Sequence, residues 1–119
     1  MKKSLRKSEM RAKSKTFIPP VSVARNAARA LRWHKELGSG MTAVGVRRAV
    51  QLSKRQPVSL QTLKRMKAYF DRHESDSRKL GFRVGWPGYS TKGRIAWDAW
   101  GGKEGRDWAE REIRKAEKK

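Results

Sequence analysis

The chain has 119 residues, enough for one domain with a modest core, and its lack of cysteine excludes disulfides, iron–sulfur clusters and thiolate zinc sites. Its 31 Lys and Arg residues outnumber the 11 Asp and Glu residues, and the formal net charge is +20. Such a charge repels itself in the compact state, so a polyanionic partner would relieve it. Nucleic acid is the first candidate, ahead of an acidic protein surface or anionic lipid.

Residues 1–18 form the first predicted segment. They carry seven Lys or Arg residues, one acidic residue and few apolar ones, so they cannot bury enough surface to offset the entropy lost on ordering. We predict a flexible basic arm here, followed by a single helical domain over residues 19–119. The arm lacks the apolar stretch of a secretory signal, and no run approaches the roughly 20 apolar residues of a membrane helix.

The rest of the chain shows the apolar spacing of helices and no convincing strand pattern. Gly38 and Gly40 can stop a first helix that begins near Val21, while Thr42 and Ser59 are suitable N-caps for the next two. An irregular loop, FRVGWPGYSTKG, precedes the C-terminal helices. The pattern predicts an all-α fold, a compact bundle of about five short helices over residues 21–38, 42–55, 60–73, about 91–100 and 103 onward.

Basic residues gather on the first three predicted helices. Residues 25–67 contain eleven Lys or Arg residues and a single acid, Glu36. Residues 42–55 and 60–73 have the lengths of a helix–turn–helix pair, whose second helix would lie in the groove of a duplex. The alternative is a helical hairpin with a merely solvated basic surface. The candidate nucleic-acid-binding residues are Arg25, Arg29, Arg32, Arg47, Arg48, Lys54, Arg55, Gln61, Lys64 and Arg65.

Aromatic residues cluster near the C-terminus, where Trp86, Tyr89, Trp97, Trp100 and Trp108 lie within 23 residues. Exposed rings of this kind can stack on bases. A small chain with few large aliphatic residues also needs aromatic side chains to fill its core, which favours a core role for Trp97 and Trp100. Trp86, in the irregular loop, is expected to be the exception.

The segment DRHESD gathers His73 with Asp71, Glu74 and Asp76. Histidine and carboxylates can ligate a metal or transfer protons, as a nuclease requires. However, adjacent residues diverge on a helix, and no second cluster supplies further ligands. The segment is therefore interpreted as the end of a helix, and no catalytic residue, metal site or cofactor is expected.

Three blocks, ARNAARALRWHKELGSGMTAVGVRRAVQL, PVSLQTLKRMKAYFDRHESD and GRIAWDAWGGKEGRDWA, resemble a small domain found in tailed-phage genomes. The similar region runs from about Val23 to Ala109 and leaves out the basic arm. Members of this family occur alone or attached to structural and head-associated phage proteins. The resemblance implies a viral origin and a helical fold, and it carries no catalytic residue with it.

These observations predict a phage-encoded, small, basic nucleic-acid-binding protein that acts stoichiometrically rather than as an enzyme. Double-stranded DNA is favoured over RNA, and the expected location is the nucleoid in the host cytoplasm or the virion interior. The alternative is a protein-interaction module that docks on an acidic host or virion protein, such as a polymerase, nuclease or capsid component. A metal-dependent nuclease is a lesser alternative, and no membrane partner is expected.

Overall fold

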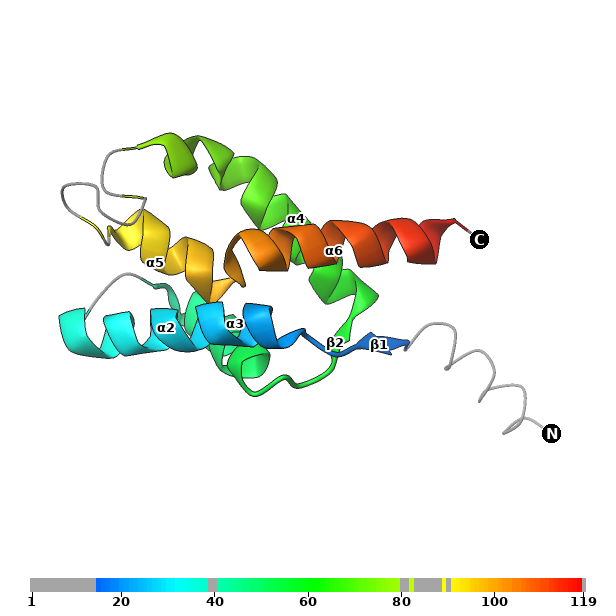
Figure 1. Cartoon of the computed structure of the whole chain (residues 1–119), viewed down its shortest axis with the longest axis horizontal. Helices are drawn as coiled ribbons and strands as arrows, with labels where there is room; N and C mark the ends of the chain where they lie inside the picture. Colours follow the sequence, from blue (N-terminus) through cyan, green and yellow to red (C-terminus); the bar gives the residue numbers. More distant parts are fainter. Residues whose placement is uncertain (1–14, 39–40, 80–81, 83–88, 90, 119) are drawn as a thin grey trace.

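The computed structural model describes residues 15–38, 41–79, 82, 89 and 91–118. Residues 1–14 of the predicted arm, and most of the predicted loop including Trp86, lie outside these ranges. Within them the chain is mostly helical, which confirms the predicted all-α class in its coarse form (Figure 1). The order of elements is β1 (Thr16–Phe17), α2 (Val21–Leu37), α3 (Ala43–Ser53), β2 (Val58–Ser59), α4 (Leu60–His73), the 3-10 helix η1 (Glu74–Arg78), α5 (Lys92–Ala99) and α6 (Gly102–Glu117).

Side-chain caps set the starts of three helices. Thr42 accepts a hydrogen bond from the backbone N–H of Gly45, and Ser59 accepts one from that of Thr62, as the sequence predicts. A threonine in front of α5 caps that helix in the same way. Gly38 ends α2 in the left-handed conformation, and its N–H donates to the carbonyl of His34.

Two short strands are absent from the sequence prediction. β1 pairs antiparallel with β2, with Thr16 opposite Ser59 and Phe17 opposite Val58. Phe17 and Val58 are both buried, so Thr16 and Phe17 belong to the folded domain and not to a flexible arm ending at residue 18. Strands of two residues are too short to show an alternating pattern, which is why the sequence does not reveal them.

Helix α5 lies centrally in the packing, in contact with α2, α3, α6 and η1 (Figure 1). α3 packs mainly on α2, and α4 packs mainly on α6. The two segments of the predicted helix–turn–helix pair, residues 42–55 and 60–73, thus correspond to α3 and α4, each of which packs mainly on another helix. No helix in the described ranges is long and apolar enough to cross a membrane.

The core is built from aliphatic and aromatic side chains of every described α-helix. Phe70 and Leu63 of α4 are fully buried, as is Ile95 of α5. Trp97 packs edge-on against the rings of Phe70 and Phe82, with centroids 4.8 and 5.3 Å away. Its predicted core role is therefore confirmed. Trp100 is partly buried and packs against this core, so its predicted core role holds only in part.

A close approach of backbones forms the corner between α5 and α6. Gly101 adopts φ 108°, which a residue with a side chain rarely adopts. A Cβ atom built on Gly105 would lie 2.8 Å from the carbonyl oxygen of Trp100. That oxygen belongs to the backbone and cannot move aside, so the corner requires glycine at position 105.

Replacing Gly105 with Ala should lower the free energy of unfolding by about 1–3 kcal/mol, because the added methyl group overpacks the corner. Gly93 in α5 is the control, since a Cβ there would meet only atoms at 3.8 and 3.9 Å. Gly93→Ala should raise the free energy of unfolding by roughly 0.5–1 kcal/mol through helix propensity alone. Urea unfolding measures both, and stabilisation by both changes would contradict the described corner.

Candidate nucleic-acid interface

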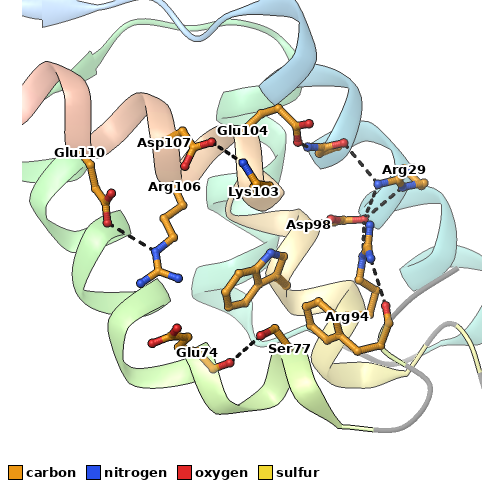
Figure 2. A pocket seen from close by; sticks show the side chains of 13 residues that line it. Arg29, Glu74, Ser77, Arg94, Asp98, Lys103, Glu104, Arg106, Asp107 and Glu110 are labelled. Carbon is orange, nitrogen blue, oxygen red and sulfur yellow. Dashed lines mark hydrogen bonds and ion pairs between the residues drawn. The ribbon is translucent and has the colours of Figure 1, made fainter. Parts of the chain in front are cut away.

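One of the predicted contact residues, Arg29, belongs to a buried ion-pair network. Asp98 of α5 is fully buried, and its Oδ2 accepts hydrogen bonds from Nη2 and Nε of Arg29 at 2.8 and 3.1 Å. Arg94 donates from Nε to the same oxygen at 3.3 Å and from Nη1 to the carbonyl of Phe82 at 3.0 Å (Figure 2). Burial raises the pKa of Asp98, and the two guanidinium groups oppose that rise. Arg29 therefore holds α2 to α5.

The cavity beside this network, of about 870 Å³, carries charges of both signs (Figure 2). Lys103 Nζ lies 2.9 Å from Asp107 Oδ2, and Arg106 Nε lies 3.4 Å from Glu110 Oε2. These pairs compensate one another within α6, as i,i+4 neighbours commonly do. The cavity therefore presents no concentrated positive charge to an anion.

Two more predicted contact residues have structural partners. Arg55 has a positive φ of 53°, and its Nε donates to the carbonyl oxygen of Pro19 at 2.7 Å, which ties the end of α3 to the segment before α2. Lys64 on α4 forms an exposed ion pair of 3.1 Å with Glu117 near the end of α6. An exposed pair of this kind contributes little to stability and screens the lysine charge.

The exposed arginines of α2 lie at a separate place. Arg25 and Arg32 line a shallow hollow together with Arg29 and with an acid, Glu104. Lys54, at the end of α3, is also exposed but lines neither this hollow nor the other described cavities. The ten predicted residues thus do not form one group.

Three of the predicted arginines converge on one cleft between α3, α4 and the end of α5. Arg47 and Arg48 come from α3, Arg65 comes from α4, and Trp100 follows α5 as its C-cap. Gln61, exposed on α4, lies one helical turn before Arg65. We call this site the arginine cleft, and among the described residues its lining contains no acid: Val44, Arg47, Arg48, Gln51, Arg65 and Trp100.

Arg48 is the most constrained residue of the arginine cleft. Its Nη1 donates to Oε1 of Gln51, and its guanidinium carbon lies 5.4 Å from the ring centroid of Trp100. Its Nε is buried and has no hydrogen-bond partner among the described residues. Burial lowers the pKa of Arg48, and the positive charges of Arg65 and Arg47 lower it further. An anion in the cleft would supply the counter-charge that the cleft lacks.

Sequence reasoning identified the arginines of the cleft but not Trp100 or Gln51. Gln51 follows Arg48 by three residues, and this spacing on a helix could have indicated a shared face. Trp100 is separated from Arg48 by 52 positions, and only the packing of α5 on α3 brings the two together. In the segment DRHESD, Asp76 lies 3.0 Å from both His73 Nδ1 and Lys79 Nζ, and Asp71 pairs with Arg106 of α6 at 3.2 Å.

No metal-binding group of three or more His, Cys, Asp or Glu side chains occurs among the residues that the structure describes. No family model matches the chain. No curated protein and no solved structure matches it either. A proposal about function therefore rests on the chemistry of the arginine cleft.

Arg29→Ala should lower the free energy of unfolding by about 2 kcal/mol or more. The value should fall below the roughly 3–5 kcal/mol typical of a broken buried pair, because Arg94 still contacts Asp98. Arg25→Ala, one turn earlier on the same helix and exposed, should change stability by less than about 0.5 kcal/mol. Chemical denaturation compares the two, and equal stabilities would show that Arg29 is not a structural residue.

Proposed function

We propose that the protein binds nucleic acid stoichiometrically and that the arginine cleft takes a phosphate of the nucleic-acid backbone. The observation that carries the proposal is the convergence of Arg47, Arg48 and Arg65 from two helices on one cleft. Arg48 there is partly desolvated and faces two like charges. Such an arrangement is unfavourable in the free protein and becomes favourable when an anion binds.

Phosphate fits this chemistry better than a carboxylate on a protein surface. Guanidinium groups bind phosphate oxygens through two parallel hydrogen bonds, and three such groups can address several oxygens of one phosphate. The net charge of +20 extends far beyond one site, and a polyanion neutralises more of it than a small anion can. Double-stranded DNA, with one negative charge per roughly 1.7 Å of axis, remains the favoured ligand.

Three finer predictions belong to this proposal, a base contact by Gln61, helix–turn–helix docking and a phage origin, and the observations support them to different degrees. Gln61 is exposed and one turn from Arg65, so it is the candidate for a contact to a base edge next to the bound phosphate. Helix–turn–helix docking is supported only by the order and length of α3 and α4, because the two helices pack mainly on different partners. We propose a phage-encoded role in association with DNA, which rests on the resemblance of the three sequence blocks.

Arg47→Gln and Arg65→Gln test the cleft, since both side chains are exposed and neither change should affect folding. Each change should weaken binding to all duplex sequences alike. Each should also make the slope of log affinity against log salt concentration shallower by about 0.9, because one phosphate contact is lost. Fluorescence anisotropy across a salt series measures both quantities.

Arg114→Gln is the matched control, because it removes the same charge from an exposed position on α6 outside the cleft. It should change the affinity and the slope much less than either cleft variant. Equal effects from all three variants would mean undirected attraction to a highly charged chain. That result would overturn the proposed site and favour a protein partner.

A further inference from the structure

A second hollow adjoins the arginine cleft and shares Trp100 with it. Its volume is about 380 Å³, and we call it the aromatic groove. This volume lies at the lower end of the range for small-molecule sites and suits one planar group. The walls that matter here are Met41, Gly45, Tyr69, His73, Ala96 and Trp100.

A continuous column of rings forms part of the groove wall. Trp100 and Tyr69 are stacked, with centroids 4.9 Å apart and planes 9° apart. The ring of His73 lies 4.5 Å from that of Tyr69, at 30°. Arg48 of the arginine cleft lies over the ring of Trp100, so the column begins at the cleft and continues into the groove. Rings packed in this way are held in position before any ligand arrives.

Gly45 gives an independent indication that the groove is kept open. It lies inside α3, where glycine weakens a helix relative to alanine. A Cβ atom at this position would meet Thr42 Oγ1 at 3.5 Å, Met41 Cβ at 3.6 Å and Trp100 Nε1 at 3.9 Å, which are ordinary contacts. Local packing therefore does not require glycine here, whereas a larger side chain would occupy the groove between Met41 and Trp100.

The charges of the groove suit a nucleotide. Asp76 is the acid in its lining, and its pKa is lowered by a hydrogen bond from Lys79 and by another from His73. Its negative charge is thus already compensated. Lys92 also lines the groove, and Thr42 and Lys92 mark the N-terminal ends of α3 and α5, which carry partial positive charge.

We infer that the aromatic groove receives one unpaired base whose neighbouring phosphate lies in the arginine cleft, so that an unpaired stretch of DNA gains a contact here that a duplex does not make. The inference rests on the proposed function for the phosphate contact. A paired base is stacked inside a duplex and cannot enter the groove. Duplex DNA therefore uses the cleft alone, while a single strand uses both the cleft and the groove.

The test compares binding of an oligothymidylate, an abasic strand of equal length and a duplex, measured by fluorescence anisotropy at one salt concentration. The wild-type protein should bind the oligothymidylate about tenfold or more tightly than the abasic strand, because only the former presents a base to the groove. Equal affinities for the two strands would overturn the inference without any variant being needed.

Gly45→Leu, which fills the groove, should reduce oligothymidylate affinity to that of the abasic strand and change duplex affinity far less. Ala43→Leu adds the same side chain to an exposed position of the same helix and should keep the preference for the base-containing strand. Loss of the preference in both variants, or in neither, would overturn the assignment of the base to the groove.

Arg65→Gln separates the two proposals. If it weakens binding to all three ligands, the phosphate contact in the arginine cleft is supported, whatever the result for the aromatic groove. If it weakens binding to none of them, the proposed function itself is wrong.

Discussion

The buried carboxylate of Asp98 is the interaction on which the arrangement of the other elements depends. It accepts hydrogen bonds from Arg29 on α2 and Arg94 on α5, and it is one of very few polar side chains in the described core. A buried charge of this kind is tolerated only when its partners are held in place, so it fixes α2 against α5 more specifically than apolar packing does. Asn26 adds to the same junction by donating to the carbonyl of Gly101 at 2.8 Å.

The sequence predicts structural features that depend on residues close together in the chain. It does not predict contacts between residues that are far apart in the chain. Thr42 and Ser59 could be recognised as caps, because a cap acts on a residue three positions away. Arg29 could not be assigned its role, because its partner Asp98 is 69 positions away. By spacing alone it matched the exposed arginines of α2. The arginines of the cleft could be predicted from composition and spacing. The position of the Trp100 indole beside them could not, because it depends on tertiary packing.

Charge is distributed unevenly along the chain, and the lining of the arginine cleft is one described part of the surface without an acid. Residues 37–70 contain no Asp or Glu, whereas five of the acids lie on α6. Four of these acids form ion pairs with described residues, as Asp107 does with Lys103 and Glu110 with Arg106. Lys64 reaches Glu117 across the surface, but the arginines of α3 have no acid close to them in their cleft. The repulsion that remains there is local, so a ligand that relieves it must bind at that place.

Trp100 connects the stability of the fold to the proposed site. Its ring forms a wall of both the arginine cleft and the aromatic groove, and its carbonyl oxygen lies where a side chain on Gly105 would have to go. The corner between α5 and α6 therefore determines where the indole stands relative to Arg48 and Tyr69. A change that loosens this corner would separate the arginines proposed to bind phosphate from the ring column without altering any arginine. Both parts of the proposed site use the side chain of Trp100. The proposed phosphate and base contacts should therefore weaken together when the corner is disturbed, and separately when only the cleft or only the groove is changed.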